Sequence, residues 1–277
     1  MTVEARDAPR TFLLYLLAAF GWSWLFWMPE ALAAQGVLTV PEGVGRFLRS
    51  PFNPAAFGPL VAALAVTTLL GGRSGCARFL HATVFHRFPK RWLVVGAALP
   101  LALYPAGILL ARWLWPGSVE LERVTDPMTA AIGFIVILLT AGPLQEELGW
   151  RGLAQSALRV RWGACAAGAL VGVVWWFWHI PLVFIERKFL VNTPPEFLAL
   201  GLVITSTSVL MGWLVDRAGG NVLPALLYHT SMNWALWIVV SSLQFTWPAL
   251  LVMAGPIGVG IALVCSVPGL RSAGDRS

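Results

Sequence analysis

The sequence predicts an all-α fold, a polytopic transmembrane helical bundle with about eight helices. Of its 277 residues, 58% are hydrophobic and 12% are charged, whereas about a quarter of the residues in a soluble domain are charged. Apolar stretches follow one another from Thr11 to Val267 with only short polar gaps. Because a spanning helix needs about 20 apolar residues, this pattern predicts one membrane-embedded domain rather than a soluble globule.

Eight stretches approach the length of a spanning helix, and the fourth is expected to continue as an amphipathic helix to Leu158. They lie near residues 11–33, 53–71, 91–114, 127–145, 162–185, 196–215, 221–243 and 246–267. We interpret residues 11–267 as a single transmembrane domain between two tails, residues 1–10 and 268–277. The sequence shows no internal repeat and no linker that would indicate a second domain.

The first stretch and the cysteines each allow two interpretations. Basic residues before the run and small residues after it resemble a signal peptide, but the run is long enough to span, so we expect the first helix to be retained. The cysteines lie far apart without a CxxC or metal-type spacing, so free thiols are expected at Cys76, Cys165 and Cys265.

The basic residues predict the orientation in the membrane. With the N-terminus in the cytoplasm, most of the 19 Lys and Arg residues fall on the cytoplasmic side, as the positive-inside rule requires. The formal charge of +6 does not indicate nucleic acid, because the basic residues are scattered and match no nucleic-acid motif. We therefore expect a multi-pass protein of the cell membrane with both termini cytoplasmic, and the lipid bilayer as its surroundings.

The first group of polar residues lies at the end of the fourth stretch. Glu146 and Glu147 are adjacent, and Arg151 follows four residues after Glu147. Residues at i and i+4 share a helix face, so Glu147 and Arg151 are expected to pair, whereas Glu146 is rotated by about 100° and is the freer carboxylate. Such a carboxylate is suited to general acid or base chemistry. The alternative is that both glutamates mark the interfacial end of the helix.

Two further polar groups lie inside apolar stretches, where ionisable residues are a functional hypothesis by default. His179 follows a run of aromatic residues and shares a helix face with Trp175. His229 and Asn233 are one helical turn apart and are expected to face one cavity as hydrogen-bond donors. The alternatives are a core histidine bonded to a backbone carbonyl and hydrogen bonds between helices.

Taken together, the pattern Glu-Glu-x-x-x-Arg, aromatic-x-x-x-His and His-x-x-x-Asn resembles the CPBP family of intramembrane proteases. This family includes type II CAAX prenyl endopeptidases and bacteriocin-processing, Abi-like enzymes. The second motif usually has Phe where this chain has Trp175. The resemblance covers chiefly residues 140–240 and implies a CAAX-protease-like core at about 127–243.

The resemblance implies hydrolysis of a peptide bond within the membrane. Glu146 would activate a water with the help of His179, while His229 and Asn233 would stabilise the oxyanion. The implied substrate is a membrane-anchored peptide or protein, and a prenylated substrate is one option.

The resemblance also implies how the site is supported. Glu147 and Arg151 would hold it together, and Trp175 and Trp178 would contact the substrate. A conical polar cavity open toward the cytoplasmic side would admit the peptide.

A zinc ion is a further expectation that the sequence leaves open. Glu146, His179 and His229 offer the O and N donors that zinc prefers, but no HExxH motif is present. In a metal-free scheme the glutamate itself acts as the general base, and the same residues are required.

Two other classes of function compete with the protease. A transporter would use Glu146, His179 and His229 as a proton or ion path, although transporters often have paired repeats. A non-catalytic immunity or maturation partner would use the same scaffold to bind another protein, and it would not need the carboxylate of Glu146.

Overall fold

The computed structural model describes residues 8–50, 53–119, 121, 124–185, 191, 193–239 and 245–266, and the predicted all-α fold is confirmed over these ranges. No strand occurs in this part of the chain. The helices are α1 (Ala8–Ala34), α2 (Glu42–Leu48), the 3₁₀ helix η1 (Pro54–Phe57), α3 (Gly58–Leu80), the π-helix η2 (His81–Phe85), α4 (Arg91–Leu114), α5 (Pro127–Thr140), α6 (Pro143–Glu147), the π-helix η3 (Leu148–Gln155), α7 (Ser156–Trp178), α8 (Ile180–Val183), α9 (Pro194–Arg217), α10 (Leu223–Val239) and α11 (Trp247–Ser266).

The eight predicted stretches correspond to helices α1, α3, α4, α5, α7, α9, α10 and α11. Among the described residues, five helical stretches are long and apolar enough to cross a membrane: Ala8–Ala34, Pro54–Phe85, Arg91–Leu114, Pro127–Trp178 and Pro194–Arg217. The fourth of these contains 52 residues and includes two of the predicted stretches. The protein is therefore a multi-pass membrane protein.

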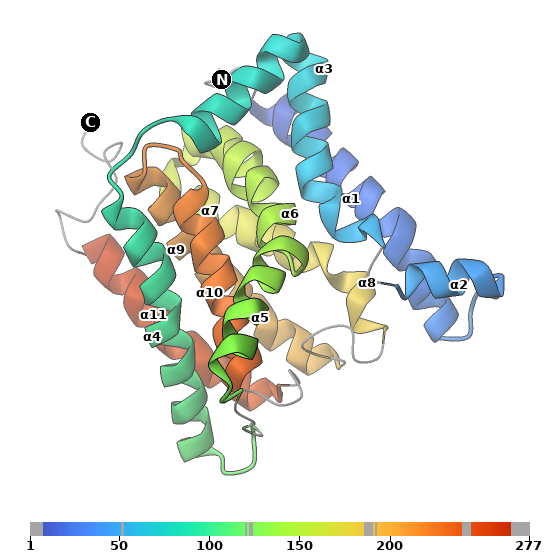
Figure 1. Ribbon diagram of the computed structural model, residues 1–277, viewed down its shortest axis with the longest axis vertical. Helices are drawn as coiled ribbons and strands as arrows, with labels where there is room; N and C mark the ends of the chain where they lie inside the picture. Colours follow the sequence, from blue (N-terminus) through green and yellow to red (C-terminus); the bar gives the residue numbers. More distant parts are fainter. Residues whose placement is uncertain are drawn as a thin grey trace.

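The helices form a bundle in which α7, α9 and α10 lie between two outer groups (Figure 1). One outer group contains α1, α2 and α3, and the other contains α4 and α11. Helix α9 packs against both α7 and α11, and α10 packs against α4. Every residue of α9 from Thr207 to Asp216 is buried. Because α9 is the centre of the bundle, side chains from its buried half can reach the candidate site.

Helix α5 lies at the periphery of the bundle. Its N-cap is Asp126, whose Oδ2 accepts a hydrogen bond from the backbone N–H of Thr129 at 2.7 Å. Hydrogen bonds from the Thr129 side chain and backbone hold the pKa of Asp126 below its ordinary value. Ile137 is the buried residue of this helix, and Phe134 packs against Trp234 of α10. The exposed apolar side chains, such as Met128 and Ile132, are available to lipid.

The continuous helix expected from residue 127 to Leu158 is wrong at Ala141 and Gly142. Helix α5 ends at Thr140, and Gly142 has φ 104°, a conformation that glycine adopts without strain. Pro143 then starts α6, because proline disfavours the helical conformation of the residue before it and is tolerated in the first turn. Both faces of the segment that follows are covered by protein, since every residue from Gln145 to Gln155 is buried.

The described residues cover the predicted tails and cysteines only in part. The start of α1 and the end of α11 lie in the upper half of the view in Figure 1. The side of the membrane on which they lie stays a prediction. Of the predicted tails, residues 8–10 belong to α1, and the remainder falls outside the described residues. Cys76 and Cys165 are not part of a disulfide bond, in agreement with the prediction, whereas the Cys265 side chain is not among those described.

Candidate active site

The two glutamates are positioned by the short helix α6, directly after the break that follows α5. Gly142 is the N-cap residue, and its N–H donates to Oε1 of Gln145 at 3.1 Å. The chain then continues into the π-helix η3, which carries Arg151. Single π-helical turns are frequent at functional sites. This local structure turns Glu146 and Glu147 into the interior of the bundle, where both are buried.

Glu147 lies in a fully buried ionic network, and its predicted pairing with Arg151 is confirmed. Oε2 of Glu147 accepts from Nε of Arg151 at 3.0 Å, and neither side chain is exposed. Its other oxygen, Oε1, lies 2.8 Å from Nδ1 of His229 on α10. Both carboxylate oxygens of Glu147 therefore have partners, as a buried charge requires.

Arg151 is held by α9 and α7 as well as by Glu147. Its terminal nitrogen donates to Oγ of Ser208 at 2.6 Å, and Ser208 in turn donates to the carbonyl of Gly168 at 2.5 Å. The guanidinium also lies over the ring of Trp175, 5.2 Å from its centroid. The ion pair thus links η3, α7 and α9 in addition to α6 and α10.

Glu146 has different surroundings. Its Oε2 accepts from the indole Nε1 of Trp175 at 2.6 Å. Its Oε1 faces Gly142, where a Cβ atom would lie only 2.6 Å from it. The absence of a side chain at Gly142 therefore keeps space open next to one oxygen of Glu146.

The two histidines both pack against Trp175. The ring centroids of His179 and His229 are 5.8 Å and 5.2 Å from that of Trp175. Nδ1 of His179 lies 2.8 Å from the carbonyl of Trp175, and because a carbonyl only accepts, Nδ1 carries the proton. In the neutral ring Nε2 of His179 is then the acceptor.

His229 and Asn233 both reach the break between α5 and α6, but they contact different atoms there. Cε1 of His229 would lie 3.2 Å from a Cβ on Gly142. Asn233 donates from Nδ2 to the carbonyl of Ala141 at 2.9 Å. The two side chains therefore flank the open side of Glu146.

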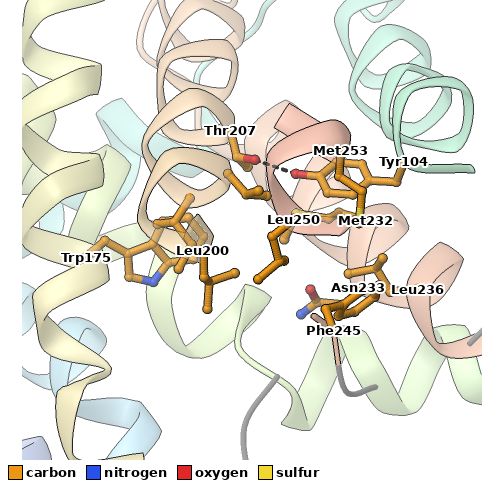
Figure 2. A pocket seen from close by; sticks show the side chains of 12 residues that line it. Tyr104, Trp175, Leu200, Thr207, Met232, Asn233, Leu236, Phe245, Leu250 and Met253 are labelled. Atoms are coloured by element: carbon orange, nitrogen blue, oxygen red, sulfur yellow. Dashed lines mark hydrogen bonds between the residues drawn. The ribbon is translucent and has the colours of Figure 1, made fainter. Parts of the chain in front are cut away.

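A cavity of about 40 Å³ lies beside these residues, between α4, α9, α10 and α11 (Figure 2). Trp175 lines one side of it, and the hydrogen-bonded pair of Tyr104 and Thr207 lies across from Asn233 in this view. The remaining lining side chains are apolar: Leu200, Val203, Ile204, Met232, Leu236, Phe245, Leu250 and Met253. A conical polar cavity was expected here, whereas this cavity is mainly apolar, and Asn233 rather than His229 is part of its lining.

The comparisons with known proteins match the part of the chain that builds this site. A family model described as type II CAAX prenyl endopeptidase Rce1-like matches residues 128–235. The chain is also 24% identical over 231 residues to CAAX prenyl protease 2 of Methanococcus maripaludis, which covers 79% of this chain and 82% of that protein. The predicted family resemblance is confirmed. Residues 128–235 are thus similar to type II CAAX prenyl endopeptidases.

Most of the predicted site residues lie close to one another. Glu147 joins His229 to Arg151, ligand atoms of Glu146 and His229 lie within 4.8 Å of each other, and Trp175 holds Glu146. Trp178 instead packs against Trp27 of α1 and Trp150 of η3, with centroid distances of 4.5 Å and 5.7 Å. It is 1% exposed. Its predicted contact with substrate therefore finds no support, whereas Trp175 does line the cavity.

The donors do not assemble the zinc site that was expected. The described residues that bring ligand atoms within 4.8 Å of one another are Glu146, Glu147 and His229, and His179 is not in this set. Both oxygens of Glu147 are bonded to Arg151 and to His229, which leaves Glu146 and one nitrogen of His229. Catalytic zinc sites usually have three protein ligands, and a zinc ion at this site stays a prediction.

Sequence reasoning missed Gly142 and Ser208. The dipeptide Gly142–Pro143 was a local signal for the break, because Gly-Pro pairs mark turns. Ser208 offered no local signal, since it meets Arg151 across a separation of 57 residues.

Proposed function

We propose that the protein is an intramembrane endopeptidase in which Glu146 activates the hydrolytic water. The observation that carries the proposal is the difference between two adjacent buried carboxylates. Both oxygens of Glu147 are bonded within the protein, whereas Oε1 of Glu146 faces the space beside Gly142. A general base must be within hydrogen-bond reach of the proton that it takes, and Oε1 of Glu146 is the carboxylate oxygen with room for a water.

The two histidines are assigned different roles by their hydrogen bonds. His179 donates from Nδ1 to the carbonyl of Trp175, and its ring packs against Trp175, which holds Glu146; its proposed role is to orient the water. Nδ1 of His229 lies 2.8 Å from Oε1 of Glu147, and when both ring nitrogens carry a proton, Nε2 is a second donor. His229 then donates from Nε2 to the oxyanion that forms on the scissile carbonyl.

Asn233 and Glu146 complete the proposed reaction. The amide nitrogen of Asn233 has two protons, and one of them is donated to the carbonyl of Ala141, so the second is available for the substrate carbonyl. After water adds to that carbonyl, the proton held by Glu146 passes to the leaving amine, and the C–N bond breaks. Ionic bonds of Glu147 and Arg151 keep these groups in place.

The proposed substrate is a membrane-associated peptide with an apolar side chain near the scissile bond. The cavity next to Trp175 and Asn233 is lined mainly by apolar residues, which suits such a side chain. The name of the archaeal relative, CAAX prenyl protease 2, extends the proposal to prenylated C-terminal segments.

The test compares Glu146→Gln with wild type in proteoliposomes, on quenched membrane-anchored peptides with and without a prenyl group. Because general base catalysis contributes about 10²–10⁴-fold, cleavage should fall by at least about 10²-fold while the unfolding temperature stays unchanged. Glu42→Gln is the matched control, since the Glu42 side chain is 84% exposed and should leave cleavage intact. Full activity in a folded Glu146→Gln variant would reject the proposal.

The same assay tests the predicted zinc ion. Wild type is assayed with a strong zinc chelator and again after zinc is restored. Activity that is lost and then regained would show that a metal takes part, and unchanged activity would favour the glutamate acting without one.

A further inference from the structure

Helix α3 changes direction at Gly72, near one end of the bundle. Gly72 has φ 63°, a left-handed conformation that interrupts the helix. The part of α3 before Gly72 runs along the bundle, whereas residues 73–85, in α3 and η2, cross its upper end (Figure 1). Arg73 and Arg78 are exposed on this segment. Because charged side chains that face hydrocarbon are strongly disfavoured, we place residues 73–85 at the membrane surface.

The segment of residues 73–85 is attached to the bundle by one face. Phe79 and Thr83 are buried, and both contact η3, since a Cβ on Gly152 would lie 3.2 Å from the Phe79 ring and 3.3 Å from the Thr83 methyl group. The carbonyl of Thr83 also accepts from the backbone N–H of Val222 at 2.8 Å. The opposite face of the segment is therefore held in a fixed orientation, away from the bundle.

The outward face of this segment belongs to a surface of basic side chains. Five exposed basic residues lie on the segment and on the turn that leads to α4, and we call them the basic surface: Arg73, Arg78, Arg87, Lys90 and Arg91. None of these five side chains forms an ion pair within the described part of the chain. The protein itself therefore leaves their charge available to a partner.

Negative charge is scarce at this end of the bundle. Over residues 70–93 and around the start of α7 and the end of α9, all of which the structure describes, the acidic residue is Asp216, and it is paired with Arg159. At the far end of α1, by contrast, the exposed Arg46 lies next to its acidic partner Glu42. The basic surface therefore presents charge of one sign, which attracts an anionic partner.

The position of the basic surface selects the kind of anion. Phe85 is 70% exposed at the end of the same segment, and exposed aromatic side chains next to basic ones are typical of helices at the boundary between lipid headgroups and acyl chains. Headgroups are present at this level of the bilayer, whereas an acidic soluble protein would have to approach from water. We propose that the basic surface binds the headgroups of anionic phospholipids. This binding is separate from peptide hydrolysis and does not require Glu146.

The test measures the binding of single phospholipids to the whole chain in neutral detergent by native mass spectrometry. Phosphatidylglycerol, which is anionic, should bind wild type more tightly than phosphatidylcholine, which has no net charge. Each basic side chain near an anionic membrane surface strengthens the attraction about five-fold. The Kd of phosphatidylglycerol should therefore rise at least about five-fold in Arg73→Gln/Arg78→Gln, at an unchanged Kd of phosphatidylcholine.

Arg46→Gln/Arg49→Gln is the matched control. It removes two exposed arginines from α2 and its C-cap, and the Kd of phosphatidylglycerol should stay at the wild-type value. Arg87→Gln/Lys90→Gln repeats the test on the other half of the basic surface, should the first pair of substitutions impair folding. Equal affinity of wild type for the two lipids, or an equal rise of the Kd in the control, would overturn the proposal. Tighter binding of an oligoglutamate peptide than of phosphatidylglycerol would assign the basic surface to an acidic protein and would also overturn it.

Discussion

Glu146 and Glu147 are neighbours in α6 and both are buried, yet the groups that surround the two carboxylates differ. We call these surroundings the Glu146 side and the Glu147 side. On the Glu147 side, each oxygen is bonded to a cationic or titratable group, Arg151 and His229. On the Glu146 side, one oxygen is held by Trp175 and the other faces a glycine. The difference separates a carboxylate that holds the fold together from one that is kept available for chemistry.

The two carboxylates also differ in how their charge is tolerated inside a membrane protein. A charge inside a membrane protein is tolerated when it is paired or faces an internal cavity. Arg151 satisfies the first condition through Glu147 and Ser208. Glu146 lies next to the second kind of place, since Trp175, which donates to it, lines the apolar cavity. Changes on the Glu147 side should therefore act on stability, and changes on the Glu146 side on turnover.

The largest effect is expected from Arg151→Met, which removes the cationic partner of Glu147 and lowers the free energy of unfolding. Removing one partner of a buried ion pair leaves an uncompensated charge and destabilises by about 3–5 kcal/mol. The measurement is reversible unfolding in mixed micelles. Arg46→Met is the control, because the Arg46 and Glu42 side chains that form its ion pair are 73% and 84% exposed. Exposed pairs contribute at most about 1 kcal/mol. Equal losses in the two variants would contradict the structural role of Arg151.

The second prediction closes the open side of Glu146 with Gly142→Ala. The new Cβ would lie 2.6 Å from Oε1 of Glu146, and displacing a catalytic group by about 1 Å lowers the rate about 100-fold. Positive φ adds about 1–2 kcal/mol of strain.

Gly36→Ala separates these two effects of Gly142→Ala. Gly36 also has positive φ, 70°, but nothing lies within 4 Å of its Cβ position. Peptide cleavage and unfolding are measured for both variants. A loss of stability in each, with a loss of turnover in Gly142→Ala alone, is expected. Wild-type turnover in a folded Gly142→Ala variant would show that the space beside Oε1 is not used.

The sequence predicted those parts of the site that depend on local spacing. The pair of Glu147 with Arg151 follows from one helical turn, and the helical stretches follow from runs of apolar residues that need no partner to be recognised. The bond between His229 and Glu147 joins residues 82 apart. Local periodicity holds no information on which helices become neighbours, so this contact required the fold.

The expectations that failed also depended on which helices become neighbours. The fourth stretch was expected to continue as one helix to Leu158, but it breaks at Gly142, and α3, α7 and α9 pack around the buried residues 145–155. The cavity was expected to be polar, but the polar groups of Glu147 and Arg151 are bonded to each other, and α4, α9, α10 and α11 supply the apolar lining. Trp178 was expected to face substrate, and α1 covers it instead.

The smallest loss of stability is expected from Ser208→Ala, which tests whether the network of Glu147 and Arg151 includes Ser208 of α9. Ser208 joins Arg151 to the carbonyl of Gly168 with bonds of 2.6 Å and 2.5 Å. Loss of a buried hydrogen bond to a charged group destabilises by about 1.5–3 kcal/mol, at unchanged turnover. Ser74→Ala is the control, since Ser74 is exposed and bonds only within its own helix, to Gly71. If both variants unfold like wild type, Glu147 alone holds Arg151, and the structural region ends at that ion pair rather than reaching α9.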